Sequence, residues 1–392
     1  MHLSLYKRFR LAAALLIVVL GLHGEGFARQ AGDYREAPLQ PAPDTTRAFM
    51  LYSRANGFKE QAAYDSAYFY FLAAYDEYSR INSYEKCVNT LCNLAIVARL
   101  QGDYNIAAHH LNNALLIGNN TLDVDNNKHM AVLYNQLGVL YRIKSEYDQA
   151  LHYFVKALEI RKRIYGDRHI RVGVTLNSLG LLYLKLGDYQ RCIDYLTQSL
   201  ACYEAHYGEN HYKTAIVYAN LGVTHVDIGD IDASIFYLQK ALEINESMLA
   251  PHHPNLASNY MQLARSYSFK GDFDKVFLYF NKAFAIIQHT FPEAHDETAL
   301  AYSFIAIIHK AINEYDQAIE LFNKAIGIWE AIHGPQYGEI ALSLKHLGDI
   351  YFEQANYGEA LATYRQALSI YRANYPGDFV ILAKIYKQLG HV

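Results

Sequence analysis

The sequence predicts an all-α protein built from stacked helical hairpins. The first observation is a turn that recurs along the chain. The aromatic or apolar residue that ends each turn stands at positions 104, 147, 189, 231, 273, 315 and 357, which differ by 43, 42, 42, 42, 42 and 42 residues. A fixed period between 20 and 50 residues is typical of solenoids. The second observation is that residues on both sides of each turn recur with helical spacing.

The helix before each turn carries a small residue followed three positions later by an aromatic ring. Gly138 and Tyr141 form the first clear pair. The same pair recurs as Gly180/Tyr183, Gly222/His225, Ala264/Tyr267, Ala306/His309 and Gly348/Tyr351. We expect the small residue to let the neighbouring helix approach closely, and the ring to fill the space beside it.

The helix after each turn carries an apolar stripe. In one copy the stripe is Ala150, Phe154, Ala157 and Leu158, whose offsets of 4, 7 and 8 put them on one helical face. It recurs as Ser234/Leu238/Ala241/Leu242, Ala318/Phe322/Ala325/Ile326 and Ala360/Tyr364/Ala367/Leu368. One hairpin buries too little surface to be stable alone, so we expect the copies to stack into a continuous core.

These spacings (small–x–x–Tyr, Gly-Asp-Tyr and Ala–x3–Phe–x2–Ala-Leu) resemble the tetratricopeptide repeat (TPR). The period of that repeat is 34 residues, and the extra residues here lie between one hairpin and the next, as at Gly166–His169. Repeats of 42 residues are similar to those of kinesin light chains and of many bacterial secreted TPR proteins. The resemblance covers residues 45–390 and implies a right-handed superhelical solenoid of helix–turn–helix repeats.

Residues 1–28 are predicted to be a signal peptide. A basic start is followed by an apolar run over Leu11–Leu20 and by small residues at Gly26 and Ala28. We therefore expect export to the periplasm or the extracellular space. The alternative is an uncleaved N-terminal anchor. The uncharged stretch Leu11–Gly24 is shorter than the ~20 residues of a spanning helix, which favours cleavage and no membrane span afterwards.

The rest of the chain is divided by its repeats. Residues 29–44 carry Pro38, Pro41 and Pro43 and are predicted to be a flexible linker. A degenerate first repeat is expected over residues 45–82, seven repeats over 83–376, and a terminal helix forming a partial repeat over 377–392. This last helix is either a cap or the start of a continuation into an effector domain. Its many apolar residues, such as Phe379 and Ile381, favour the second interpretation.

Composition and motifs argue against several functions. The net charge of −4 gives no electrostatic footprint for nucleic acid. The sequence contains no HExxH, GxSxG or GxxxxGK motif, so we expect no enzyme and no cofactor. The four cysteines lack metal-ligand spacing, and we expect neither a metal site nor a disulfide framework. Histidines between hairpins, such as His169 and His211, are expected to make local hydrogen bonds.

The resemblance implies where partners bind. In TPR solenoids the first helix of each repeat lines a concave groove, and ligand positions lie three residues before the small residue and one, four and five after it. Carried over to this chain, the partner-binding candidates are Arg99, Asn135, Arg142, Asn177, Lys185, Met261, Arg265, Lys310 and Lys345.

Two groups of candidates suggest the ligand. Asn135 and Asn177 occupy matching positions, and an amide ladder can hold a peptide backbone. Arg99, Arg142 and Lys185 form a basic stretch, which is followed by apolar positions that include Met261. This pattern fits a protein or peptide ligand with acidic residues beside a hydrophobic anchor. The alternative is an ordinary solvated surface. The TPR clamp for C-terminal carboxylates is not reproduced, because Asp349 rather than Asn follows Lys345.

The sequence therefore predicts a non-catalytic scaffold that binds proteins or peptides in the groove. The alternative is a sensor or regulatory segment of an effector enzyme or signalling receptor. A further hypothesis is self-association through the terminal repeats, since exposed ends of a solenoid can stack.

Overall fold

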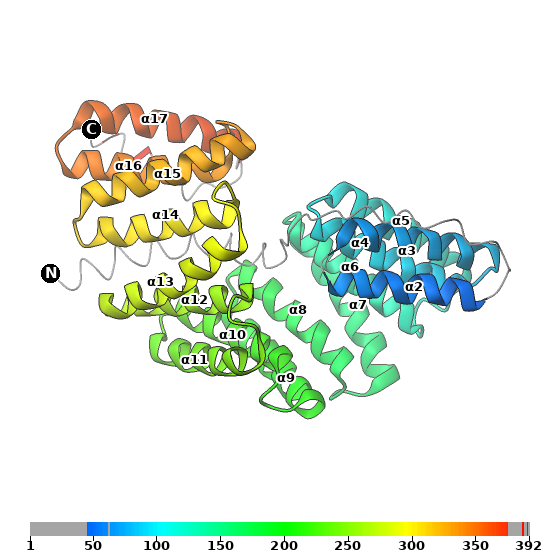
Figure 1. The fold of residues 1–392 in the computed structure, drawn as a ribbon. Helices are drawn as coiled ribbons and strands as arrows, with labels where there is room; N and C mark the ends of the chain where they lie inside the picture. Colours follow the sequence, from blue (N-terminus) through cyan, green and yellow to red (C-terminus); the bar gives the residue numbers. More distant parts are fainter. Residues whose placement is uncertain (1–44, 62, 375–385, 388–389, 391–392) are drawn as a thin grey trace. The chain divides into compact units, whose positions relative to one another are not determined.

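The computed structural model describes residues 45–61, 63–374, 386, 387 and 390. The predicted signal peptide over 1–28 and linker over 29–44 lie outside the described residues. So does most of the terminal helix predicted over 377–392. Within the described residues the chain contains 16 helices and no strand, which confirms the all-α prediction (Figure 1).

The helices form two compact units, which meet in the sequence between Ile244 and Asn245. The described part of the N-terminal unit contains α2 (Thr45–Glu60), α3 (Tyr64–Arg80), α4 (Tyr84–Leu100), α5 (Tyr104–Thr121), α6 (Lys128–Ile143), α7 (Tyr147–Tyr165), α8 (Ile170–Leu186), α9 (Tyr189–Tyr207), α10 (Tyr212–Ile228) and most of α11 (Ile231–Met248). The C-terminal unit contains α12 (Pro254–Lys270), α13 (Phe273–Thr290), α14 (Asp296–Ala311), α15 (Tyr315–His333), α16 (Gly338–Glu353) and α17 (Tyr357–Asn374).

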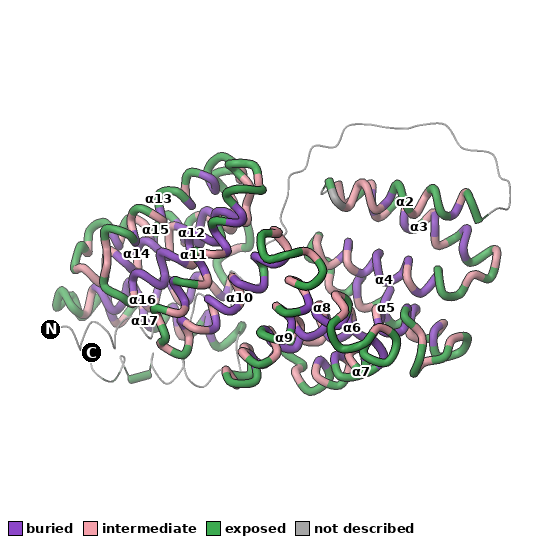
Figure 2. The backbone as a smooth tube through the Cα atoms, turned by 90° about the horizontal axis from the view of Figure 1, so that it is seen from below, coloured by how far each residue is buried: buried purple, intermediate pink, exposed green. Residues whose placement is uncertain are grey.

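Within each unit, consecutive helices pair into hairpins and the hairpins stack. The buried residues follow the faces along which these helices meet (Figure 2). The predicted stripe on α7 is part of this core, because Ala150, Phe154 and Ala157 have no exposed surface. The structure thus confirms a solenoid of helical hairpins in each unit.

The small residue and the ring act as predicted. A Cβ atom added at Gly138 would lie 2.6 Å from the ring of Phe154, so only glycine fits there. Three residues on, the ring of Tyr141 stacks on Tyr153 with centroids 5.5 Å apart. His225 replaces the tyrosine in a later repeat and stacks on Tyr237 at 5.3 Å. The pair is therefore a packing device that accepts either ring.

The Gly-Asp-Tyr turn has a backbone explanation. Its first residue adopts a left-handed conformation, as at Gly187 with φ 74°, which glycine reaches without strain. The aspartate then caps the second helix: the Asp188 side chain accepts a hydrogen bond from the backbone N–H of Arg191 at 3.1 Å. The motif ends one helix and begins the next within three residues.

The histidines between hairpins are helix caps. Each begins the first helix of a repeat, and its Nδ1 accepts the backbone N–H two residues later at 3.1–3.2 Å. These residues are His169, His211, His253 and His295. The predicted local hydrogen bonds are confirmed.

Most of these cap rings also stack on an aromatic residue four positions earlier. Tyr165 and His169, for example, have centroids 4.5 Å apart. Before α16 the order is reversed, with His333 stacked on Tyr337 at 4.1 Å. Tyr337 then provides no side-chain cap for this helix.

Replacing Gly138 tests the close helix approach. We expect Gly138→Ala to lower the free energy of unfolding by about 1–3 kcal/mol, because the added methyl group overpacks the Phe154 ring. Gly57→Ala is the matched control, since nothing lies within 4 Å of a Cβ there and alanine favours a helix by about 1 kcal/mol. Urea unfolding measures both variants. Equal destabilisation by the two substitutions would contradict the packing role.

Replacing His253 tests the caps through pH. Burial lowers the pKa of His253, so below the ordinary histidine pKa of about 6.5 the unfolded state takes up a proton that the folded state resists. Stability is therefore lost as the pH falls from 7.5 to 5. His253→Asn keeps a cap that does not titrate, like Asn127, whose side chain caps α6. We expect this variant to lose less stability on acidification in thermal melts, and identical pH slopes would argue against the cap.

Candidate functional site

The nine candidate residues all lie on first helices of hairpins. The N-terminal unit carries five of them, on α4, α6 and α8, and the C-terminal unit carries four, on α12, α14 and α16. We call the α4, α6 and α8 positions the N-terminal wall, defined by Arg99, Asn135, Arg142, Asn177 and Lys185. The candidate residues of the two units differ in the partners that the chain itself gives them.

The basic residues of the N-terminal wall lie close enough to influence one another. Burial lowers the pKa of the Arg142 guanidinium, and the charge of Arg99 lowers it further. Burial likewise lowers the pKa of Lys185, with Arg142 adding to the effect and Asp227 opposing it. The structure thus brings the three predicted cations together around Arg142.

Arg142 is the least compensated of these cations. Its Nε atom is fully buried, and within the described residues its side chain makes neither a hydrogen bond nor an ion pair. A half-buried guanidinium whose Nε has no acceptor carries a desolvation cost. A ligand that brought a carboxylate or carbonyl oxygen to Arg142 would remove part of that cost.

The two asparagines of the wall are already bonded inside the chain. Asn135 is 3% exposed, and its Oδ1 accepts a hydrogen bond from Nη1 of Arg161 at 3.5 Å. The Oδ1 atom of Asn177 accepts one from Nδ2 of Asn220 at 2.9 Å. These bonds occupy part of the amide ladder, so its role in holding a peptide backbone stays a prediction.

Arg161, on the second helix α7, is a residue that the sequence reasoning missed. It is 5% exposed. Its Nη1 donates to Oγ1 of Thr175 at 2.6 Å and to the carbonyl oxygen of Arg171 at 2.9 Å, besides Asn135. Burial lowers its pKa to about 10, and the charge of Arg171 contributes. Aligning the repeats would have found it, because the same position holds Tyr203, Asn245, Ile287 and Trp329.

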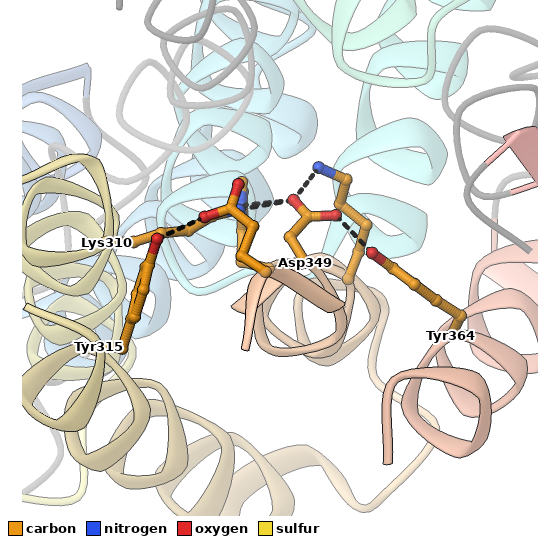
Figure 3. Close-up of polar contacts among 7 residues, drawn as sticks. Lys310, Tyr315, Asp349 and Tyr364 are labelled. Carbon is orange, nitrogen blue, oxygen red and sulfur yellow. Dashed lines mark hydrogen bonds and ion pairs between the residues drawn. The ribbon is translucent and has the colours of Figure 1, made fainter. Parts of the chain in front are cut away.

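The lysines of the C-terminal unit are neutralised by an aspartate. Nζ of Lys310 and Nζ of Lys345 lie 2.6 and 2.7 Å from Oδ2 of Asp349, and the Tyr364 hydroxyl donates to Oδ1 at 2.9 Å (Figure 3). Burial alone would raise the pKa of Asp349, but the two lysine charges outweigh it and hold that pKa well below its ordinary value.

This cluster ties three helices together. Lys310 comes from α14, Lys345 and Asp349 from α16, and Tyr364 from α17. Beside it the Tyr315 hydroxyl donates to Glu353 at 2.8 Å. The two candidate lysines thus have a structural task, and their binding to a partner stays a prediction.

The last two candidates are covered by the chain itself. Met261 is 3% exposed and Arg265 is 2% exposed. The guanidinium of Arg265 lies 5.9 Å from the ring centroid of Phe269. Direct contact of either residue with a partner is an untested prediction.

The part of the chain that the structure describes has no group of three or more His, Cys, Asp or Glu side chains placed to hold a metal ion. Its four cysteines are buried and free. Burial raises the pKa of Cys87 to about 11, which suits a packing role rather than a nucleophile. Among the same residues no helix is both long and apolar enough to cross a membrane.

The comparisons with known proteins agree with this geometry. The family model described as tetratricopeptide repeat matches residues 129–205, 174–247 and 297–373, and a second model with the same description matches residues 257–289. The chain belongs to the tetratricopeptide repeat family. No curated protein matches it.

Several solved structures are similar to this TPR protein. The apo form of the quorum sensor NprR from B. thuringiensis aligns with a TM-score of 0.64 and 12% identity, over 82% of this chain and 87% of that one. A Rap protein complexed with competence and sporulation factor aligns with a TM-score of 0.60 and 14% identity, over 89% and 98%. A putative kinesin light chain from Podosopora anserina aligns with a TM-score of 0.43 and 18% identity, over 50% and 93%. At such identities the likenesses to NprR and to the Rap protein show the fold alone.

Removing the charge of Asp349 tests the cluster. Asp349→Asn removes the carboxylate that lies within ion-pair distance of both Lys310 and Lys345, and only the charge of Glu353, which has a smaller effect on Lys310, remains. We therefore expect a loss of about 3–5 kcal/mol in the free energy of unfolding. Glu320→Gln is the matched control, because it breaks another Lys–carboxylate pair four residues apart, on the exposed surface of α15, where such pairs contribute little. Denaturant unfolding distinguishes the two, and a stability loss no larger than that of the control would contradict the compensating role.

Proposed function

We propose that this TPR protein is a non-catalytic interaction scaffold that binds an anionic peptide or protein segment on its N-terminal wall. One observation carries the proposal: the Arg142 guanidinium is half-buried among other cations and has no acceptor within the described residues. An acidic ligand would supply that acceptor. A charge-assisted hydrogen bond of this kind contributes about 1.5–3 kcal/mol.

The contrast between the two units supports the choice of the N-terminal wall. In the C-terminal unit the lysines at candidate positions have Asp349 within ion-pair distance. In the N-terminal unit, by contrast, Arg99 and Lys185 flank a guanidinium that no carboxylate neutralises in the described residues. Electrostatic complementarity therefore favours an anionic partner there.

A solved structure of similar fold also supports ligand binding, and the burial of Met261 limits what can be proposed about the ligand. The Rap structure is a complex with competence and sporulation factor, so a protein of similar fold binds a ligand in that case. The hydrophobic anchor expected from the sequence used apolar positions that include Met261, which is buried here. The proposal accordingly rests on the acidic part of the ligand.

We also propose export of the chain, on the basis of the sequence of residues 1–28 alone.

Charge reversal on the wall tests the proposal. The probes are two fluorescent pools of random ten-residue peptides, one with Glu at alternate positions and one with Gln at the same positions. We expect the full chain to bind the Glu pool more tightly, and Arg142→Glu to weaken that binding about tenfold or more. Fluorescence anisotropy measures both effects.

Lys86→Glu is the matched control. It introduces the same change of charge at an exposed position on α4, so it should leave binding of the Glu pool within about twofold, since rim charges contribute little. An equal loss in both variants would indicate non-specific attraction, and no preference for the Glu pool would refute an anionic ligand.

A further inference from the structure

Arg161 stands in a column of residues that is otherwise uncharged. The second helices α7, α9, α11, α13 and α15 each contribute one residue to this column. Each of these residues pairs with the residue 14 positions later, in the first helix of the next hairpin. The pairs are Arg161/Thr175, Tyr203/Val217, Asn245/Asn259, Ile287/Ala301 and Trp329/Ser343. All of these side chains are buried or half-buried. Only the first pair contains a formal charge.

The pair Asn245/Asn259 shows which side chains can occupy this position between two hairpins. Nδ2 of Asn245 donates to Oδ1 of Asn259 at 3.3 Å, so a neutral amide pair fills the slot. Aromatic and aliphatic residues fill it elsewhere. A guanidinium is therefore not required for stacking one hairpin on the next, and a buried charge costs several kcal/mol unless it is paired.

The protein supplies Arg161 with neutral acceptors only. Its three acceptors are the hydroxyl oxygen of Thr175, the carbonyl oxygen of Arg171 and the amide oxygen of Asn135. No carboxylate of the described residues forms an ion pair with it, and the charge that shifts its pKa most is the cation of Arg171. The positive charge of Arg161 is thus uncompensated.

One edge of the guanidinium has no acceptor in the described residues, and the Arg161 side chain is 5% exposed. All three contacts use Nη1, and Nε and Nη2 have no acceptor within the part of the chain that is described. Neither atom is among the fully buried unbonded nitrogens, so both retain some contact with solvent. Nε and Nη2 form one edge of the planar guanidinium, and such an edge matches the two oxygens of a carboxylate.

The contacts of Nη1 also fix the place of this edge. Asn135 belongs to α6 and is part of the N-terminal wall, while Thr175 and Arg171 belong to the first turns of α8. The guanidinium therefore lies where α6 and α8 adjoin, beside the wall. Its orientation is set by hydrogen bonds before any ligand arrives, which lowers the entropic cost of binding.

We propose that Arg161, oriented by Asn135 and Thr175, is a subsite for a carboxylate group of the ligand that the N-terminal wall binds. This inference rests on the proposed function and identifies a second contact, separate from Arg142. The carboxylate belongs either to an Asp or Glu side chain or to the C-terminus of a peptide. The chemistry is the same, and the test separates the two sources.

A double variant removes the charge while keeping the packing. Arg161→Tyr/Thr175→Val installs the pair that the next repeat uses, Tyr203 and Val217. Asn245→Tyr/Asn259→Val makes the same change in a slot without a charge and serves as the matched control. Arg161→Gln is a second variant that keeps a hydrogen-bond donor without the charge.

The probes are three pools of random ten-residue peptides. The first has an amidated C-terminus and one Glu, the second has a free C-terminus and no acidic residue, and the third has neither carboxylate. We expect the full chain to bind the first or the second pool more tightly than the third, which identifies the source. Binding of that pool should fall about tenfold or more in both Arg161 variants and stay unchanged in the control.

Each result has one meaning. Wild-type binding of the carboxylate pools by both Arg161 variants would overturn the subsite and leave the proposed function intact. Failure of the wild-type chain to bind either carboxylate pool would overturn both. Thermal melts complete the test: we expect the double variant to be at least as stable as the wild type, because an unpaired buried charge is removed. A clear loss of stability in both Arg161 variants would assign the residue to the fold and overturn the subsite.

Discussion

The close approach of two helices at one small residue is the constraint on which the hairpins depend. At Gly138 no Cβ fits beside the Phe154 ring, and the helices can be this close only because the side chain is absent. That distance brings Tyr141 and Tyr153 into stacking contact. It also places the buried stripe of the second helix against the first. Each hairpin therefore packs as one unit, and hairpins with the same internal packing stack regularly.

The repeat does not determine which charged side chains the helices carry, and the two units differ in this respect. The C-terminal unit places lysines at these positions and neutralises them with Asp349, so their charges hold α14, α16 and α17 together. The N-terminal unit places Arg142 and Arg161 without carboxylates. A charge that the protein does not neutralise is costly to stability, and it is also the kind of group that gains most from an external partner. If the N-terminal wall binds a ligand as proposed, stability and binding use charged side chains of different units.

The sequence predicts this fold well because its signals are local. The turn and the small residue with its ring each act within a few residues and lie where the period predicts them. The linker histidine does so before α8, α10, α12 and α14, while Tyr337 replaces it before α16. The candidate site was less predictable. The positions of Arg99, Arg142 and Lys185 on successive helices follow from the period, but the partners of Asn177 and Lys310 lie 43 and 39 residues away. Which side chains meet across that separation depends on rotamers and on how the hairpins stack. Arg161 was not predicted as a site residue because it lies on the second helix, whereas the family resemblance implies ligand positions on first helices only.

The reversed order of His333 and Tyr337 before α16 has a consequence for local unfolding of the C-terminal unit. Histidine caps α8, α10, α12 and α14, whereas Tyr337 provides no side-chain cap for α16 and the stacked ring of His333 belongs to the preceding helix. The first amide groups of α16 therefore lack the acceptor that Nδ1 provides for α12 and α14. Helix ends without caps fray more readily. Amide hydrogens at the start of α16 should exchange with deuterated solvent earlier than those at the start of α12, so local opening in the C-terminal unit would begin at the junction between α15 and α16.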